Sequence, residues 1–331
     1  MAALRLPGKL GFGSAAIGNL YRPISDAEAF AVVEAAWAAG LRYFDTAPHY
    51  GFGLSEKRLG AALAVLDPAG EAIVSTKVGR RLDPAPMPDL TALRQGFVSP
   101  EPFESVFDYG YDAVMRSHET SLKRLRRGSV DILLAHDIGS YAHGDAHAAR
   151  LREFLGGGLR AMRELRDVGA VKAIGLGVNE TAVCEEVLGH CDLDVILLAG
   201  RYTLLEQSPL ASLFPLCASR GVRVIAGAPF NSGILARGVR NAPPAPYEYG
   251  APPAAVIDRV GRIEDLCAQF GVPLAAAALQ FPLRHPVVEA VVPGMATVAE
   301  VEAALAWIAH PLPDALWSAL ADAGLVDTAA L

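Results

Sequence analysis

Four ionisable side chains stand where they could move a proton to or from a reacting oxygen. Asp45 ends an apolar stretch, and Tyr50 comes five residues later. Lys77 and His136 each end a further apolar stretch. If these stretches are strands of one parallel barrel, their carboxyl ends share one rim, where catalytic groups gather. The four side chains are therefore predicted to form one site.

The chemistry that suits this set is hydride transfer to a carbonyl group, which needs a proton at the oxygen, or the reverse reaction. The pKa of tyrosine is about 10, which is high for proton transfer at neutral pH. A lysine ammonium ~4 Å away lowers that pKa by roughly three at an effective dielectric constant of ~20, and burial opposes part of this effect. We expect Tyr50 to be the acid/base, with its pKa lowered by Lys77. Asp45 would keep the ammonium charged, and His136 would orient the reacting oxygen.

The elements that must position these groups follow an α/β pattern, in which short apolar runs alternate with longer amphipathic stretches. Strands are predicted within 9–18 and at 42–46, 72–77, 130–136, 173–178, 195–199, 223–228 and 287–292. Helices are predicted at 25–39, 54–66, 111–127, 180–189 and 209–220, within 255–270, and at 273–283, 298–309 and 313–323. Ser25 and Glu28 form a capping box at the start of the first helix, and Gly40 is placed to end it.

This order predicts a (β/α)8 TIM barrel, a single domain over residues 1–331 with an extra C-terminal helix. The stretches 131–135 and 195–198 read as strands covered on both faces. An open doubly wound sheet is the alternative, but it usually carries a G-x-G-x-x-G turn, and neither candidate turn has the third glycine. Long loops at 79–108, which has five prolines, and 231–255 are expected to shape the pocket.

Composition and charge exclude several classes of function. The net charge of −7 argues against nucleic acid as a partner, because phosphate requires a basic surface. No stretch approaches the ~20 apolar residues of a membrane span, and the first residues lack a signal-peptide core. We therefore expect a cytoplasmic monomer or small homo-oligomer with no membrane partner. The cysteines form no C-x-x-C pair and are expected to be reduced and partly buried: Cys184, Cys191, Cys217 and Cys267.

Three segments around the four candidate residues resemble the aldo-keto reductase superfamily. They are RYFDTAPHYGFGLSEKRLG at 42–60, IVSTKVG at 73–79 and VDILLAH at 130–136. The resemblance implies an NAD(P)-dependent barrel that needs no metal. It makes Tyr50 the acid/base, Lys77 and Asp45 its tuning pair, and His136 the orienting residue.

Four further segments are similar to the aldose 1-dehydrogenase branch of that superfamily, namely 18–23, 47–51, 201–207 and 228–233. That branch includes enzymes that oxidise L-fucose or D-galactose at C1, and similar proteins act on pyridoxal.

The resemblance also implies which residues hold the nicotinamide cofactor. Asn179 matches a residue that binds the carboxamide, although it could also cap the next helix. Ala199 stands where many relatives carry a glutamine for the same amide, and Gly227 where many carry an aromatic residue that stacks on the ring. The implied cofactor contacts are Asn179, Ala199, Gly227, Pro229, Phe230, Ser232, Gly233, Leu235, Pro293, Gly294, Met295 and Glu300.

The segment 292–300 resembles the motif that holds the adenosine end of the cofactor. Many NADP-specific relatives place Lys and Arg where this chain has Gly294 and Glu300. A carboxylate in place of cations disfavours a 2′-phosphate and suits a free 2′-hydroxyl, so we expect NAD to be preferred, with NADP as the alternative. Thr297 and Glu300 also form a T-x-x-E capping box, which would turn Glu300 towards its own helix.

The leading hypothesis is an aldose 1-dehydrogenase in which the Tyr50 phenolate takes the anomeric hydroxyl proton while hydride leaves C1, giving a lactone. The expected substrate contacts are Tyr21, His49, Asp137 and Asn231. The alternatives are a pyridoxal 4-dehydrogenase, a small-aldehyde or ketone reductase, and, from other classes, a cofactor-binding regulatory subunit or a cofactor-free isomerase or aldolase. His118 shares a helical face with Val114 and Leu122 and is interpreted as a packed histidine.

Overall fold

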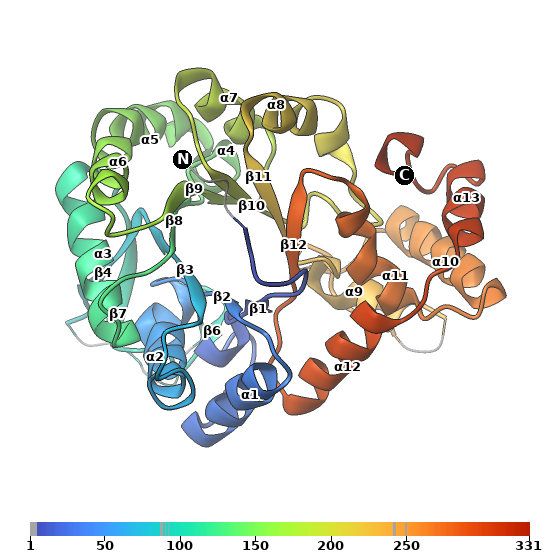
Figure 1. The fold of residues 1–331 in the computed structure, drawn as a ribbon, viewed down its shortest axis with the longest axis horizontal. Coiled ribbons are helices and arrows are strands. Elements are labelled where there is room, and N and C mark those ends of the chain that lie inside the picture. The colour runs from blue at the N-terminus through green and yellow to red at the C-terminus, as the bar shows by residue number, and fades with distance from the viewer. Residues whose placement is uncertain (1–4, 87–88, 90, 92, 241–242, 249) are drawn as a thin grey trace.

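The computed structural model describes residues 5–86, 89, 91, 93–240, 243–248 and 250–331. Its main sheet has eight parallel strands in chain order: β1 (Phe12–Gly13), β2 (Tyr43–Asp45), β3 (Ile73–Val78), β8 (Ile132–His136), β9 (Ala173–Val178), β10 (Val195–Ala199), β11 (Arg223–Gly227) and β12 (Val288–Val292). The sheet closes where the N–H of Gly11 donates to Val291 O at 2.9 Å and that of Gly13 donates to Pro293 O at 3.0 Å. Figure 1 shows the resulting ring of strands with helices outside it. The predicted (β/α)8 barrel is confirmed, and the open sheet is wrong.

The outer layer consists of helices that cover this ring. They are α1 (Asp26–Ala38), α2 (Leu54–Leu66), α3 (Tyr111–Leu125), α4 (Ser140–His143), α5 (His147–Glu153), α6 (Leu159–Asp167), α7 (Ala182–His190), α8 (Leu213–Arg220), α9 (Ile234–Arg237), α10 (Ala254–Gln269), α11 (Leu274–Gln280), α12 (Val298–Ala309) and α13 (Asp314–Asp322). Short helical turns lie at η1 (Ala16–Gly18), η2 (Tyr50–Gly53), η3 (Gly144–Ala146), η4 (Phe154–Gly158), η5 (Ser208–Leu210), η6 (Asn231–Gly233), η7 (Phe281–Arg284) and η8 (Thr328–Ala330). The expected extra C-terminal helix is α13. The predicted capping box holds α1, with Ser25 as its N-cap, and Gly40 follows that helix with φ 89°.

The first strand, expected within 9–18, is the short Phe12–Gly13, because the chain then turns into η1. Other predictions were wrong for local reasons. The helices α4 to α6 were not predicted at all. The π turn η4 (Phe154–Gly158), which joins α5 to α6, contains three glycines and reads as loop sequence. Helix α11 ends at Gln280 instead of the predicted 283, because the chain continues as η7, which has a proline in its first turn.

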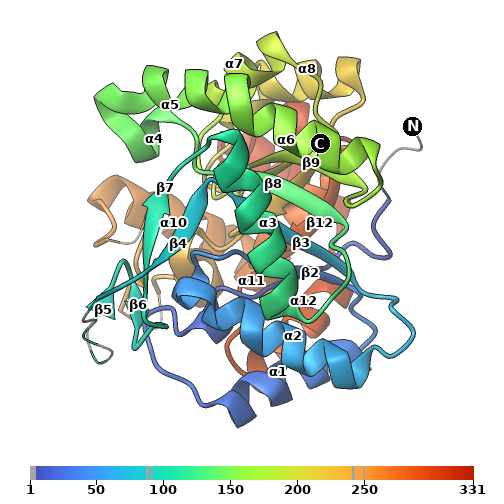
Figure 2. The same cartoon turned by 90° about the vertical axis from the view of Figure 1, so that its left-hand side faces the viewer.

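The segment that follows β3 is a pair of hairpins rather than the predicted loop. Strand β4 (Arg80–Pro84) pairs antiparallel with β7 (Phe103–Phe107), and β5 (Leu93–Arg94) pairs with β6 (Phe97–Val98). Figure 2 shows the two hairpins standing to one side of the barrel strands. Gly79, with φ 95°, makes the turn into β4. Glycine is required at this position because a Cβ would collide with the ring of Tyr109. The second predicted loop, 231–255, contains η6, α9 and the first residues of α10, and 241, 242 and 249 lie outside the described residues.

Two apolar clusters form the core. The larger one fills the space between the helices and the outer face of the sheet. The smaller one comes from alternate strand positions that point into the barrel, including Ile132 with Leu134 and Val195 with Leu197. All four cysteines are free and buried, as predicted. Among the residues described, no single helix is long and apolar enough to cross a membrane. Helix α10 passes that test only together with 274–284, across a bend of 103°.

Candidate active site

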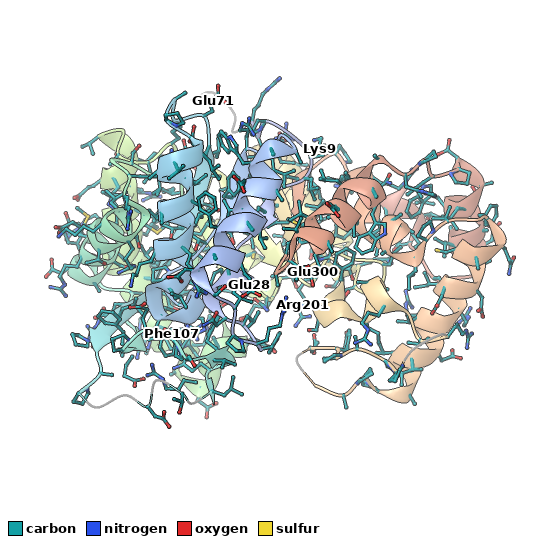
Figure 3. The ribbon with its side chains drawn as sticks, turned by 90° about the horizontal axis from the view of Figure 1, so that it is seen from below. Lys9, Glu28, Glu71, Phe107, Arg201 and Glu300 are labelled. Atoms are coloured by element: carbon teal, nitrogen blue, oxygen red, sulfur yellow. The ribbon has the colours of Figure 1, made fainter. Side chains whose placement is uncertain are left out.

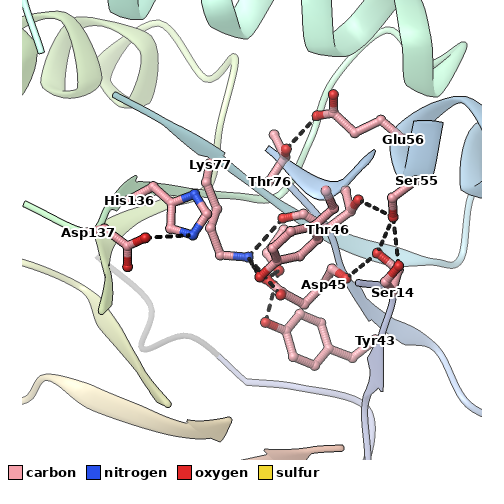
Figure 4. A network of polar contacts seen from close by, with 12 residues as sticks. Ser14, Tyr43, Asp45, Thr46, Ser55, Glu56, Thr76, Lys77, His136 and Asp137 are labelled. Atoms are coloured by element: carbon pink, nitrogen blue, oxygen red, sulfur yellow. Dashed lines mark hydrogen bonds and ion pairs between the residues drawn. The ribbon is translucent and has the colours of Figure 1, made fainter. Parts of the chain in front are cut away.

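The structure brings Asp45, Tyr50 and Lys77 together at the carboxyl ends of β2 and β3. Figure 4 shows the Lys77 side chain directed at Asp45. The Lys77 ammonium donates to Asp45 Oδ2 at 2.7 Å, to the Thr46 carbonyl at 2.9 Å and to the Tyr50 hydroxyl at 3.1 Å. These three bonds match the three protons of an ammonium group. The lysine is therefore fixed in position, with one proton directed at the phenol.

Asp45 is held from its other side as well. The Ser75 hydroxyl donates to Asp45 Oδ1 at 2.7 Å and is itself 3.0 Å from the Tyr43 hydroxyl. The side chains of Lys77 and Asp45 are 1% and 5% exposed. A buried ion pair of this kind is stable only when its remaining polar atoms are also bonded, as they are here.

The turn that carries Tyr50 depends on glycine. After Tyr50 the chain passes through three left-handed residues, with φ 65° at Gly51, 54° at Phe52 and 101° at Gly53. A Cβ added to Gly18 would lie 2.8 Å from the Tyr50 carbonyl carbon, so the turn η2 packs directly on η1. This close backbone approach sets where the phenol lies above the end of β2.

Burial decides the acidity of this phenol. It raises the pKa of Tyr50 to about 12, although the neighbouring Lys77 lowers it. The expectation that Lys77 would leave the pKa below that of free tyrosine was therefore wrong, because desolvation of the phenolate outweighs the charge. The pKa of Lys77 is raised: burial opposes its charge, but Asp45 and Tyr50 favour it more strongly. The ligand-free site thus holds a neutral phenol beside a charged ammonium.

His136 completes the group on the next strand, β8. Its ring lies edge-on to that of Tyr50, with centroids 5.9 Å apart and planes at 86°. Burial, with Lys77 next, lowers the pKa of His136 well below its usual value, so the imidazole is neutral. Its Nδ1 is buried and has no hydrogen-bond partner within the described part of the chain. A neutral imidazole beside the phenol can donate a hydrogen bond to a substrate oxygen.

His49 and Asp137 lie beside these groups. The His49 ring is 6.0 Å from that of His136, and its Nδ1 is 3.0 Å from the Ser105 hydroxyl. Burial, with nearby cations, lowers the pKa of His49 to about 2. Asp137 Oδ2 is 3.6 Å from His136 Nε2. Two of the four predicted substrate contacts therefore adjoin the catalytic candidates.

The other two predicted substrate contacts are placed differently. Tyr21 is 58% exposed, and its backbone N–H donates to Gly96 O at 2.9 Å. Asn231 is 4% exposed and belongs to the β10 and β11 side of the barrel, where its Nδ2 donates to Gly200 O at 3.2 Å. No contact joins Asn231 to the four catalytic candidates among the described residues.

Sequence reasoning missed three residues of this site. Arg80 pairs with Asp137 at 3.0 Å. Tyr109 donates from its hydroxyl to the carbonyls of His136 at 2.7 Å and Asp137 at 3.1 Å. Phe97 packs against Tyr50, with ring centroids 6.3 Å apart. All three come from the segment between β3 and β8 or its flank, and their types and spacing alone do not distinguish them from their neighbours.

The first three predicted cofactor residues share one rim. Ala199 and Gly227 are partners in the register of β10 and β11, and Asn179 directly follows β9, the other neighbour of β10. Asn179 does not cap the next helix, because the N-cap of α7 is Thr181. A Cβ on Gly227 would lie 3.4 Å from Ala199, so this floor is built of small residues.

The segment after β11 has an unusual backbone. Ala228, Asn231, Ser232 and Gly233 have φ of 47°, 44°, 61° and 105°. Two of its N–H groups donate within the segment, that of Asn231 to Ala228 O at 3.2 Å and that of Gly233 to Phe230 O at 2.9 Å. The Asn231 Oδ1 is buried with no partner among the described residues. This buried acceptor fits an amide donor such as that of a nicotinamide.

Other predicted cofactor residues are partly structural. Leu235 and Met295 are 0% and 1% exposed, so only their backbones are available to a ligand. Phe230 packs edge-on against Trp307, and Gly294 is exposed, with open space where a Cβ would lie. The remaining predicted positions, Pro229 and Pro293, are buried.

The segment expected to hold the adenosine end of the cofactor lies at the start of α12, where a helix cap and one arginine are found. Thr297 accepts from the N–H of Glu300 at 3.1 Å, and Glu300 Oε2 accepts from the N–H of Ala296 at 2.6 Å. Figure 3 shows Glu300 near the middle of the view, close to Glu28 of α1. The absence of basic groups inferred from this segment is incomplete, because Arg22, from the loop before α1, donates to Ala296 O at 3.4 Å. The fold therefore brings the Arg22 cation next to this segment.

In the described ranges, no group of three or more His, Cys, Asp or Glu side chains could hold a metal ion.

Comparison with known proteins gives a consistent result. The aldo/keto reductase family profile matches residues 9–324. A pyridoxal 4-dehydrogenase from Microbacterium luteolum is 41% identical over 327 residues, which are 96% of this chain and 94% of that protein. A D-threo-aldose 1-dehydrogenase from a Pseudomonas species is also 41% identical, over 99% of this chain and 97% of that protein.

Solved structures agree on the fold. An aldo-keto reductase from Bacillus halodurans superimposes with a TM-score of 0.71 at 24% identity, covering 98% of this chain and 95% of that one. A glycerol dehydrogenase from Gluconobacter oxydans superimposes with a TM-score of 0.73 at 20% identity, covering 97% and 95%.

Proposed function

This chain belongs to the aldo/keto reductase family and is an NAD(P)-dependent oxidoreductase, and from that premise we propose that it oxidises the C1 hydroxyl of an aldose of the L-fucose or D-galactose type to the lactone. The observation that carries the proposal is the Lys77 ammonium, bonded at once to Asp45 and to the Tyr50 hydroxyl. A polar wall of His49 and Asp137 beside that hydroxyl suits a substrate with many hydroxyl groups.

In the proposed reaction, the phenolate of Tyr50 accepts the proton of the C1 hydroxyl, while the C1–H electron pair leaves as hydride and C1=O forms. The bound oxidised nicotinamide would supply the hydride acceptor and a positive charge that favours the phenolate. Neutral His136 donates a hydrogen bond to the reacting oxygen and fixes its direction. Lys77 stabilises negative charge on the Tyr50 oxygen, which burial alone disfavours.

The cofactor would lie across the ends of β9 to β12. Asn179 and Asn231, whose Oδ1 is buried without a partner among the described residues, would supply amide groups for the nicotinamide carboxamide. We propose a preference for NAD over NADP. The support is the Glu300 carboxylate at the start of α12, although the Arg22 cation reaches the same segment.

Pyridoxal is the second candidate substrate, because the two relatives named for pyridoxal and for aldoses have the same identity to this chain. A regulatory subunit and a cofactor-free isomerase or aldolase are not favoured. Both relatives are named as dehydrogenases and cover nearly the whole chain, and the proton-transfer group is complete.

The test is the reduction of NAD and of NADP by purified protein with L-fucose, D-galactose, D-arabinose, L-glucose and pyridoxal, followed by the absorbance of the reduced nicotinamide. We expect turnover of at least one sugar with NAD. A Tyr50→Phe control should lose that turnover while retaining cofactor binding and thermal stability. Turnover of pyridoxal alone would replace the aldose proposal with the second candidate. Full activity in the control would remove Tyr50 from the mechanism.

A further inference from the structure

An ion pair that takes no part in the transfer of the proton or the hydride lies at the edge of the candidate site. Arg80 Nη1 is 3.0 Å from Asp137 Oδ2, and the same carboxylate oxygen is 3.6 Å from His136 Nε2. The two side chains are 16% and 21% exposed, whereas those of Lys77 and Asp45 are 1% and 5% exposed. The Arg80–Asp137 pair is therefore open to a ligand beside the group that orients the reacting oxygen.

The pair is built into the fold rather than formed by two loose surface side chains. Asp137 has φ 52°, in the left-handed region, which aspartate adopts more readily than most residues other than glycine. The Tyr109 hydroxyl holds the turn by donating to the carbonyls of His136 and Asp137. The Arg80 guanidinium lies over the Phe107 ring, 4.5 Å from its centroid. Such an arrangement aims the carboxylate and the guanidinium in fixed directions.

Both members of the pair keep unused hydrogen-bonding capacity. Within the described part of the chain, no group donates to Asp137 Oδ1, and no acceptor meets Arg80 Nε or Nη2. None of these three atoms is among the buried polar atoms that lack a partner. The pair thus offers an acceptor and charged donors side by side, facing accessible space.

We propose that the Arg80–Asp137 pair binds the hydroxyl at C2 of the aldose, an inference that rests on the proposed oxidation at C1. With the C1 oxygen between Tyr50 and His136, the hydroxyl on the next carbon extends towards the groups adjoining His136. Asp137 accepts the proton of this hydroxyl and Arg80 donates to its oxygen, so both charges recognise the same group. Pyridoxal, whose reacting carbon is attached to an aromatic ring, offers no hydroxyl on the adjacent carbon.

The test combines a change in the enzyme with a change in the substrate. D-arabinose and 2-deoxy-D-ribose differ only in the hydroxyl at C2, and their kcat/KM ratio measures what the enzyme gains from that hydroxyl. We expect wild-type protein to prefer D-arabinose by roughly 10- to 100-fold, the range for a hydrogen bond to a charged group. Asp137→Asn and Arg80→Met should each reduce this preference at least about fivefold. Their kcat/KM for the deoxy sugar should stay near the wild-type value.

A matched control lies in the same hairpin. Arg81 and Asp83 form an ion pair at 2.8 Å, but their side chains are 34% and 42% exposed. Asp83→Asn should leave the sugar preference unchanged, and thermal unfolding of each variant confirms that it folds.

The outcomes separate the possible failures. Equal loss on both sugars in Asp137→Asn, with the preference retained, would mean that the carboxylate acts only through His136, and would overturn this inference alone. Wild-type protein that oxidises no aldose would overturn the proposed function and this inference together. A preference that collapses in Asp137→Asn and Arg80→Met but not in Asp83→Asn supports the site for the C2 hydroxyl.

Discussion

Removing the ammonium at position 77 should separate the catalytic role of Lys77 from its structural role. At the 3.1 Å between Lys77 Nζ and the Tyr50 hydroxyl, two unit charges at an effective dielectric constant of about 20 interact by roughly 5 kcal/mol. This is equivalent to about four units of tyrosine pKa. Burial already raises the pKa of Tyr50 to about 12 although Lys77 lowers it. Lys77→Met should therefore raise this pKa further, so that the phenolate does not form in the pH range of the assay.

The same change leaves the Asp45 carboxylate, 5% exposed, without its cation. An uncompensated buried charge costs about 3–5 kcal/mol of unfolding free energy. The double variant Asp45→Asn/Lys77→Met removes both charges, so we expect it to regain at least about 2 kcal/mol of that loss. Its activity should not return, because the cation that favours the phenolate is still missing.

The assays are denaturant unfolding and the kcat/KM for sugar oxidation, measured on wild type, Lys77→Met and the double variant. We expect both variants to lose roughly 100- to 10,000-fold in kcat/KM, the usual contribution of acid–base catalysis. Only Lys77→Met should lose stability strongly. Activity within tenfold of wild type in the double variant would refute the assignment of Lys77, because it would show that the loss in Lys77→Met came from misfolding.

Three further predictions concern pH, packing and cofactor choice. Because burial raises the pKa of Tyr50 to about 12 and oxidation requires the phenolate, kcat/KM for oxidation should rise with pH, and a profile that falls above about pH 8 would contradict this. Gly60→Ala would place a Cβ 2.5 Å from the Leu125 backbone and should lower the free energy of unfolding by about 1–3 kcal/mol. Gly189→Ala in α7, with nothing within 4 Å, should stabilise by about 0.5–1 kcal/mol in the same unfolding assay, and equal effects would argue against the packing explanation. Glu300→Lys should move the ratio of kcat/KM for NAD over NADP towards NADP by at least about tenfold, since the new cation can pair with the 2′-phosphate, and an unchanged ratio would place the adenosine end elsewhere.

Local sequence patterns predicted most of the barrel. Strands β9 and β10 and helices α2 and α12 have the predicted bounds, because period and capping signals lie within the elements themselves. Where a glycine-rich π turn joined two helices, at 154–158, the same reasoning failed. The hairpins between β3 and β8 were also missed, since their pairing depends on residues up to 27 apart, as between Arg80 and Phe107.

By itself, the sequence determined which groups could form the proton-transfer site. Asp45, Lys77 and His136 end three strands that are neighbours in a parallel barrel, and one rim collects all such ends. Only the tertiary structure decided how acidic the phenol is and what surrounds it. The pKa of Tyr50 depends on burial by distant segments, and Arg80 reaches Asp137 because the chain folds back across 57 residues. Desolvation and long-range ion pairs are properties of packing, which no local pattern in the chain encodes.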